Sequence, residues 1–397
     1  ADVVASRYMP PWPPEHGYGE FAHERRLSNE QQGLIQQWIT EGGKEGDPQL
    51  LPSLPQWNES WTLGKPDLVV TLSKPYQLAA EGRDVYHNFV IPIPLARNRY
   101  VKAVELLPGN ARVVHHAFIN IDTTQQSRRL AARQDPPGFD GMEVPESAIT
   151  PGGQLLSWQP GKVTTFAPPG LAWELRTNTD LVLQAHFNPS GKPELVQPSV
   201  GFYFTDAPPT NSPFRIKLTA LELDIPAGDS NYVVKQSYKL PVDVQLTRVG
   251  AHAHYLGKDL QGYAILPNGE KKWLLRIKDW NFKWQGDYEY AQPVFLPRGS
   301  ELFLDFTYDN STNNPRNPSR PPVPVRYGLQ TKDEMGELYF QALAANQQDY
   351  MTLAQDYSDK LLNLSIGFFR YRLRHDPADV EANIRLGRIL MAQGEKA

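Results

Sequence analysis

Histidines are the residues of this sequence best suited to chemistry, because five of the nine lie in or beside strand-like runs. These five are His115, His116, His186, His252 and His254. Residues two apart on a strand point to the same face, so His252 and His254 form a ready chelate. Adjacent strand residues face opposite ways, so His115 and His116 can reach one ion only at a strand end or a twist. The pattern predicts metal binding, although a lone histidine in an apolar run is more often a hydrogen-bonded core residue.

Two further residues extend these pairs to candidate ligand sets. His186 ends the apolar run that begins at Leu181, in the same half of the chain as His115 and His116. Met335 stands in the second half, which also carries His252 and His254. Three imidazoles on one side, and two imidazoles with a thioether on the other, suit a soft, redox-active ion, and the thioether favours Cu(I) over zinc.

The order of these residues resembles a known family. His115-His116, Gln184-Ala185-His186, His252-Ala253-His254 and the run Asp333–Tyr339 together resemble the type II copper, ascorbate-dependent monooxygenases, which include peptidylglycine alpha-hydroxylating and dopamine beta-monooxygenases. The likeness covers residues 61–345. It implies an enzyme that hydroxylates a C–H bond of a small or peptide-like substrate with dioxygen and two one-electron transfers. Ascorbate or another one-electron donor would supply the electrons.

The resemblance also implies a role for each site residue. His115, His116 and His186 would hold an electron-transfer copper, and His252, His254 and Met335 would hold a second copper at which dioxygen binds. Gln184 and Tyr339 would complete the catalytic set, with Gln184 on the path between the two ions. No phosphate loop, nucleophile elbow or dinucleotide fingerprint competes with this interpretation.

The sequence departs from the family at the substrate positions. The peptide-amidating members place an Arg two residues before the His-x-His pair and an Asn two residues after the Met, whereas this chain has Gly250 and Glu337 there. Tyr339 remains, and Arg248 is shifted by two residues. A glutamate at this position suits a neutral or cationic substrate. The chain also lacks the disulfides of the animal enzymes, since it contains no Cys.

The elements that must position these residues are predicted to be mainly β. Short β-branched runs separated by Pro, Gly, Asn and Asp indicate two tandem antiparallel β-sandwiches of jelly-roll type, at residues 61–206 and 207–345. The runs expected in the first are Leu68–Leu72, Tyr86–Ile93, Tyr100–Leu107, Val113–Ile121, Asp180–Phe187 and Val200–Phe204. Those in the second are Ile216–Leu223, Tyr232–Leu240, Val244–Ala251, Gln261–Leu266, Trp273–Ile277 and Glu301–Tyr308.

The two ends of the chain are expected to be helical or Pro-rich. Residues 1–60 contain one capped helix that begins near Ser28, and they resemble the tail of a c-type cytochrome in which Met9 would be the axial ligand. A haem domain outside this chain could then feed electrons to copper; the alternative is a Pro-rich docking segment. Residues 346–397 are expected to be helical, with a break at Asp376-Pro377, and resemble a partial tetratricopeptide repeat that could bind a protein partner. We therefore expect the chain to be a piece of a longer protein.

Composition narrows the remaining functions. The net charge is -4, with 40 basic and 44 acidic residues, so no field would recruit nucleic acid. No apolar run reaches the roughly 20 residues that span a bilayer. The family resemblance implies an extracytoplasmic location, in the periplasm or outside the cell. Two alternatives stay open: a non-catalytic copper-binding or assembly protein, and a zinc hydrolase built on His115, His116 and His186.

Overall fold

The computed structural model describes residues 1–53, 61–82, 84–134, 138–142, 144–168 and 170–394. The chain divides into two compact units. Unit 1 contains residues 1–14, 21–210 and 283–286, and unit 2 contains residues 15–20, 211–282 and 287–397. The predicted end of the N-terminal segment, at residue 60, lies outside the described residues. Each unit is built mainly from antiparallel strands, so the predicted fold class is confirmed.

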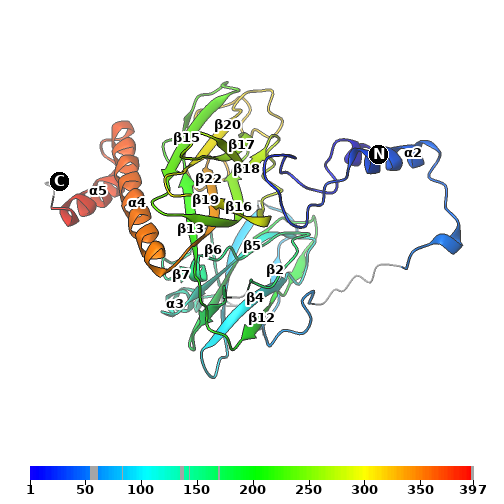
Figure 1. Ribbon diagram of the computed structural model, residues 1–397, viewed down its shortest axis with the longest axis horizontal. Helices are drawn as coiled ribbons and strands as arrows, with labels where there is room; N and C mark the ends of the chain where they lie inside the picture. Colours follow the sequence, from blue (N-terminus) through cyan, green and yellow to red (C-terminus); the bar gives the residue numbers. More distant parts are fainter. Residues whose placement is uncertain (54–60, 83, 135–137, 143, 169, 395–397) are drawn as a thin grey trace. The chain divides into compact units, whose positions relative to one another are not determined.

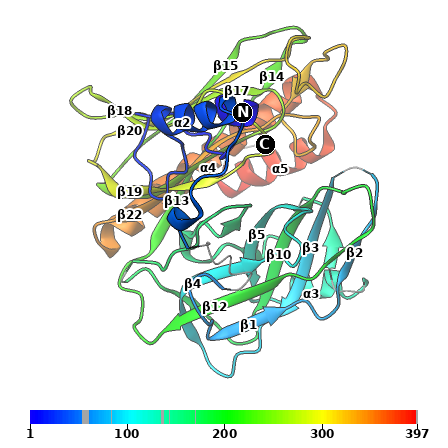
Figure 2. The ribbon, with the colours of Figure 1, turned by 90° about the vertical axis from the view of Figure 1, so that its right-hand side faces the viewer.

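Unit 1 contains two main sheets and a short strand pair (Figure 2). One sheet has the order β1-β12-β4-β9, with β1 at Leu68–Thr71, β12 at Ser199–Thr205, β4 at Arg99–Leu107 and β9 at Trp173–Leu175. The other has the order β6-β3-β10-β5-β7, with β6 at Gly138–Asp140, β3 at Val85–Pro92, β10 at Asp180–Phe187, β5 at Val114–Asp122 and β7 at Ala148–Ile149. Strand β8 (Ser157–Trp158) pairs with β5, and β11 (Glu194–Val196) pairs with β2 (Tyr76–Leu78).

The core of unit 1 explains why the sequence of its central strand β10 is almost entirely apolar. Strand β10 lies between β3 and β5, and seven of its eight residues are buried. Its side chains join a core with residues of the other sheet, including Val101, Val200 and Phe202. A strand covered on both faces needs no polar alternation, and this is the pattern of Leu181–Phe187.

Unit 2 has the same plan, with two four-stranded sheets and a short pair. One sheet has the order β13-β22-β16-β19, formed by Pro213–Thr219, Gly336–Ala344, Val244–Ala253 and Asp287–Leu296. The other has the order β15-β20-β17-β18, formed by Tyr232–Lys239, Glu301–Tyr308, Gly257–Ile265 and Lys271–Ile277 (Figure 1). Strands β14 (Asp224–Ile225) and β21 (Val325–Arg326) form the pair.

Strand β16 of unit 2 alternates between a core face and a polar face. Val249, Ala251 and Ala253 are buried, whereas Arg248 and His252 are partly exposed on the opposite face. Such alternation is expected of an antiparallel sheet with only one face in the core. The polar face therefore carries His252.

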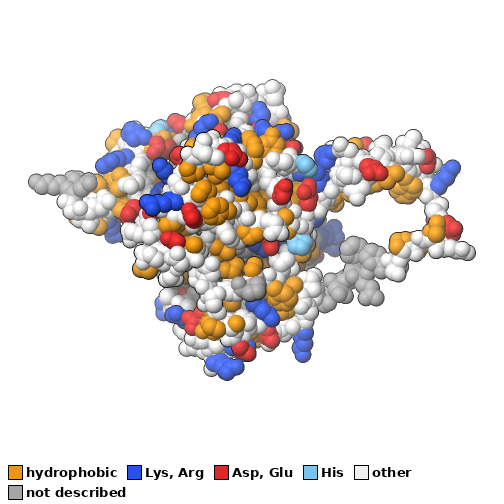
Figure 3. Space-filling view, viewed as in Figure 1, with side chains coloured by type: hydrophobic (Ala, Val, Ile, Leu, Met, Phe, Trp, Pro, Cys, Tyr) orange, Lys and Arg blue, Asp and Glu red, His pale blue; other side chains and the backbone are white. Residues whose placement is uncertain are grey.

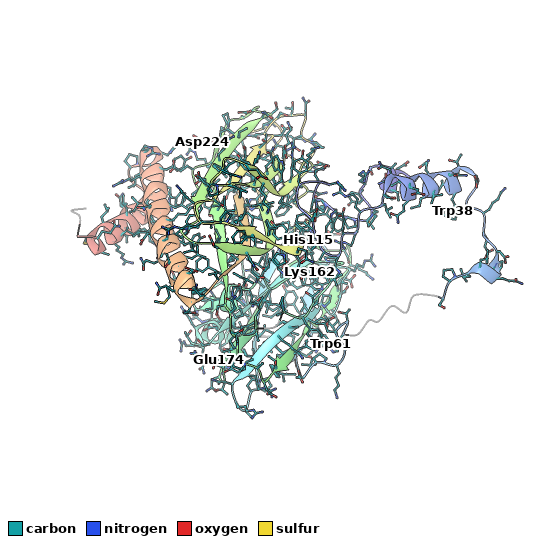
Figure 4. The ribbon with its side chains drawn as sticks, in the orientation of Figure 1. Trp38, Trp61, His115, Lys162, Glu174 and Asp224 are labelled. Atoms are coloured by element: carbon teal, nitrogen blue, oxygen red, sulfur yellow. The ribbon has the colours of Figure 1, made fainter. Side chains whose placement is uncertain are left out.

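Helices flank the strands. They are α1 (Asp2–Ala5), α2 (Asn29–Thr40), α3 (Gln126–Ala131), α4 (Gln347–His375) and α5 (Val380–Ala392), with short 3-10 turns at Pro48–Leu50 and Pro151–Gly153. Helix α2 has the predicted cap, because Ser28 accepts from Gln31 N and the Gln31 side chain bonds back to Ser28 N. No residue of α2 is buried, and Trp38 is 53% exposed (Figure 4). Helix α5 packs on α4 (Figure 1).

The structure differs from the expectation at two strands of unit 2. Strand β19 was not predicted, and β22 extends to Ala344 although the sequence after Phe340 was expected to be helical. Gln341, Ala342 and Leu343 favour helices as isolated residues, but pairing with β13 and β16 outweighs this propensity. Within the described ranges, no helix is both long and apolar enough to cross a membrane. The visible surface intersperses basic and acidic side chains (Figure 3).

Candidate metal centres

A β-bulge brings His115 and His116 of unit 1 to the same place. In the pairing of β10 with β5, His186 lies opposite His116 and Phe187 lies opposite Val114, so His115 is an extra residue without a register partner. A bulge of this kind redirects a side chain that regular pleating would send to the other face. Adjacent histidines on a strand can reach one ion only where the strand is irregular, and β5 has such an irregularity at His115.

The three histidines of unit 1 present ring nitrogens to one point. His115 Nδ1 lies 3.0 Å from His116 Nδ1 and 3.1 Å from His186 Nδ1. One ring nitrogen from each histidine lies within 4.8 Å of the others. Three nitrogens at about 2.0 Å from one tetrahedral ion would be about 3.3 Å apart, so these spacings fit a shared ion. Figure 4 labels His115.

The outer nitrogens of two of these rings have hydrogen-bond acceptors. His115 Nε2 donates to the Lys283 carbonyl at 2.6 Å, and His186 Nε2 donates to Asp84 Oδ2 at 3.1 Å. These acceptors place the ring protons on Nε2 and leave the Nδ1 lone pairs facing one another. Burial, and then the neighbouring His186, lowers the pKa of His115 to about 4. The hydrogen bond from His186 lowers the pKa of Asp84.

Gln184, a predicted catalytic residue, anchors a loop of unit 1. Its Nε2 donates to Asn88 Oδ1 at 3.0 Å and to the Met142 carbonyl at 2.8 Å. Asn88 is fully buried and donates to the carbonyls of Phe139 and Gly141. The Gln184 amide thus holds residues 139–142 against the sheet.

Unit 2 places His252 and His254 at the end of β16. Their ring centroids are 5.1 Å apart and their planes are inclined by 84°. The buried Trp280 indole donates to the carbonyls of Ala253 and His254 at 3.1 and 2.9 Å, which fixes the backbone on which both rings stand. Phe282 packs against both rings.

His254 has one ring nitrogen satisfied and one without a partner. Its Nδ1 donates to the Asp333 carbonyl at 3.0 Å, so its lone pair is on Nε2. The Nε2 atom is buried and has no hydrogen-bond partner. A buried nitrogen lone pair without a donor is uncommon, and a bound cation would satisfy it. Burial, and then the neighbouring His252, lowers the pKa of His254 to about 4.

Met335 follows the same strand pair. Strand β22 pairs His252 with Glu337 and Ala253 with Gly336, so continuing the register by one residue sets Met335 across from His254. Met335 is buried, and its carbonyl accepts from the Tyr308 hydroxyl at 2.9 Å. The structure thus carries the three predicted ligands of unit 2 on two adjacent segments.

The predicted substrate positions lie on the polar face of the same sheet. Gly250 pairs with Tyr339, and a Cβ atom at Gly250 would overlap the Tyr339 ring, so glycine is what allows the ring to lie there. Glu337 is paired with Lys217 Nζ at 2.8 Å. Burial opposes ionisation of Glu337, but Lys217 outweighs it and lowers the pKa of that carboxyl. Because its charge is already neutralised, Glu337 gives little preference for a cationic substrate.

Three groups near these centres were not identified from the sequence. Asp84 and the Lys283 carbonyl accept from unit 1 histidines, and no motif marks either position. Glu334 is fully buried beside Met335 and accepts from backbone N–H groups of the His252–Leu256 segment. In the sequence, only its position next to Met335 could have indicated that Glu334 belongs to this site.

Three solved structures illustrate how distant the structural likenesses of this chain are. No family model matches the chain, and no curated protein matches it. The major capsid protein P2 from bacteriophage PM2 is 9% identical, with a TM-score of 0.28 over 70% of this chain and 97% of that chain. The PBCV-1 VP54 structure, fitted into a reconstruction of the virophage Sputnik, is 9% identical, with a TM-score of 0.22 over 70% and 93%. The VP2 particle protein of infectious bursal disease virus is 12% identical, with a TM-score of 0.17 over 73% and 74%.

These neighbours contradict the predicted monooxygenase function. The first is described as a major capsid protein, the other two are viral proteins, and none is described as a copper oxygenase, so the prediction of C–H hydroxylation is corrected. TM-scores of 0.28 and below show no role for this chain, so no capsid function is proposed for it. The two histidine clusters are therefore the features of the chain that indicate a function.

Proposed function

We propose that this chain is a copper-binding protein with one centre in each unit. The observation that carries the proposal is the convergence of Nδ1 atoms from His115, His116 and His186, with separations of 3.0 and 3.1 Å. Two lone pairs at this distance repel unless a proton or a metal ion lies between them. Acceptors on the outer nitrogens hold the protons of His115 and His186 away from that point, which favours the metal ion.

The second centre would be formed by His252, His254 and Met335. The buried, unpartnered Nε2 of His254 supports a cation there. Two imidazoles with a thioether are a soft donor set that favours Cu(I), whereas three imidazoles alone accept copper or zinc. The choice of copper for the whole protein therefore depends on Met335, and on the family resemblance, which stays a prediction together with the extracytoplasmic location.

Copper held in these centres would supply one-electron chemistry by alternating between Cu(II) and Cu(I). The residues of the chain present the lone pairs: Nδ1 of His115 and His186 in unit 1, and Nε2 of His254 in unit 2. We propose ascorbate or a similar small reductant as the electron donor.

Metal loading tests the proposal. Metal-free protein is loaded with Cu(II), and bound copper and the electron paramagnetic resonance spectrum are measured. We expect two coppers per chain with nitrogen coupling, and loss of the signal when one ascorbate per chain supplies two electrons. His16→Ala is the matched control, since His16 is exposed and lies outside both clusters. Zinc bound in preference to copper at the three-histidine site would instead favour the zinc alternative, and fewer than two sites would contradict the proposal.

A further inference from the structure

Glu334 is a fully buried carboxyl group between the two segments that carry the unit 2 ligands. It directly precedes Met335, and both of its oxygens contact the backbone. One oxygen accepts from His254 N and, at 2.8 Å, from Met335 N; the other accepts from Leu256 N at 2.9 Å. One side chain thus joins the end of β16 to the start of β22.

The neighbouring backbone adds to this connection. The Asp333 carbonyl accepts from His254 Nδ1 at 3.0 Å, so Asp333 orients the same ring whose main chain Glu334 holds. The Tyr308 hydroxyl fixes the Met335 carbonyl from a different strand. Met335 and His254 are therefore held to one another through Glu334, and a thioether and an imidazole can face one ion only if this distance is kept.

The burial of Glu334 supports the same conclusion. A buried carboxyl group is costly unless its oxygens are hydrogen-bonded. The donors to Glu334 are main-chain N–H groups of the two segments that carry the ligands, namely those of His254, Leu256 and Met335. Both carboxyl oxygens are therefore used to hold these two segments together.

We propose that Glu334 is the positioning residue of the unit 2 centre: it ties the His-x-His strand to the methionine segment, so that both ligand types face one copper. The inference rests on the proposed function, since it assumes copper in unit 2. A role in folding alone would stabilise the unit without affecting which atoms bind the ion.

Glu334→Gln tests the proposal. Glutamine keeps the size of the side chain but replaces one acceptor oxygen with an NH₂ group that faces backbone donors. We expect Cu(I) affinity at the unit 2 centre to fall about 10- to 100-fold, as for other residues that orient metal ligands. We also expect the sulfur contribution to the copper X-ray absorption spectrum to weaken, while copper in unit 1 is unchanged. Glu301→Gln is the matched control: it makes the same change at the start of β20, where Glu301 accepts from the Ser237 hydroxyl, so affinity and sulfur scattering should stay near wild type.

The outcomes separate the inference from the proposed function. Wild-type protein that binds no copper through sulfur would overturn the function of unit 2 and the inference with it. Two wild-type coppers, together with E334Q that keeps full affinity and sulfur scattering, would overturn the inference alone. If E334Q loses the β-sheet signal in its circular dichroism spectrum and also the copper of unit 1, the role of Glu334 is in folding. This outcome also contradicts the proposal.

Discussion

The candidate centres of the two units are built in different ways. In unit 1 all three histidines lie on two hydrogen-bonded neighbours, β5 and β10, and a bulge brings the adjacent pair together. In unit 2 the histidines lie on β16, and the methionine follows from a separate segment that is tied to it by Glu334. Sheet pairing brings the candidate ligands of unit 1 together, whereas those of unit 2 need an additional buried connection.

The two centres also differ in which ring nitrogen of the histidines faces the centre. His115 and His186 point Nδ1 to the centre and donate from Nε2, whereas His254 donates from Nδ1 and points Nε2 to the centre. The acceptors are a carboxylate and a carbonyl in unit 1 and a carbonyl in unit 2. In each ring the nitrogen that donates to a hydrogen-bond acceptor keeps the proton. The other nitrogen is left with the lone pair that could bind an ion.

The largest expected effect is the loss of one centre at a time. His186→Ala should abolish copper binding in unit 1 and leave unit 2 intact, and His254→Ala should do the reverse, because each removes a lone pair from one cluster only. Copper per chain, together with the sulfur signal of the remaining site, distinguishes the two variants. If either substitution emptied both centres, the comparison of two independent sites would be wrong.

A smaller effect is expected at Asp84, which orients His186. Asp84→Ala should weaken copper in unit 1 by about 10- to 100-fold, since the ring would lose the acceptor that keeps its proton on Nε2. Asp84→Asn keeps an oxygen acceptor and should recover most of the affinity. Chelator competition measures both variants. Equal affinity in D84A and wild type would show that the strands alone orient the ring.

A substitution at Asp122, the last residue of β5, should lower the stability of the protein. Asp122 is fully buried and accepts from Thr124 N and Ser127 N, each at 2.7 Å. Burial alone would raise the pKa of Asp122, but hydrogen bonds from Ser127 and Thr124 outweigh it and hold the pKa well below its usual 3.8. Asp122→Asn should lower the free energy of unfolding by about 1–3 kcal/mol.

The pH dependence of the Asp122 variant follows from this sign. A carboxyl with a lowered folded pKa contributes stability above its unfolded pKa, and the contribution is lost as the pH falls through the folded value. Wild-type protein should therefore lose stability below about pH 4 more steeply than D122N. Urea unfolding across this range measures the difference, and parallel curves would contradict the assignment.

The smallest expected effect concerns helix α4, which packs on the sheet of unit 2. The Tyr357 hydroxyl donates to the Lys217 carbonyl and accepts from Lys217 N, both at 2.8 Å. Tyr357→Phe should lower the free energy of unfolding by about 0.5–1.5 kcal/mol in total, while copper in both units is retained. Thermal unfolding and metal content test this together. Loss of the unit 2 copper would show that the helix supports the centre.

Most strands could be predicted from the sequence because burial leaves a clear pattern. The runs Tyr100–Leu107 and Glu301–Tyr308 agree with β4 and β20 within one residue. The prediction of Val244–Ala251 stopped before the histidines, yet β16 continues to Ala253. A polar His252 ended the apparent run, although a polar side chain is expected on the outward face of such a strand.

The details of the site depend on contacts that sequence does not display. The His115 bulge is a relation between two strands, and only the pairing with β10 reveals which residue is extra. Asp84 and the Lys283 carbonyl are distant in sequence from the rings they accept from, and a carbonyl has no side-chain signature. Glu334 is next to Met335 in the sequence, but its role follows from the burial of its carboxyl group, which the amino-acid sequence does not reveal.

The extra residue at His115 suggests a rule for protein engineering. Two consecutive ligands can be turned toward one ion in an ordinary antiparallel sheet when one residue is inserted opposite an unchanged neighbouring strand. A designer could write a His-His pair into another scaffold in this way. Deleting one residue from β5 should conversely turn one imidazole to the opposite side and leave two of the three ring nitrogens at the centre.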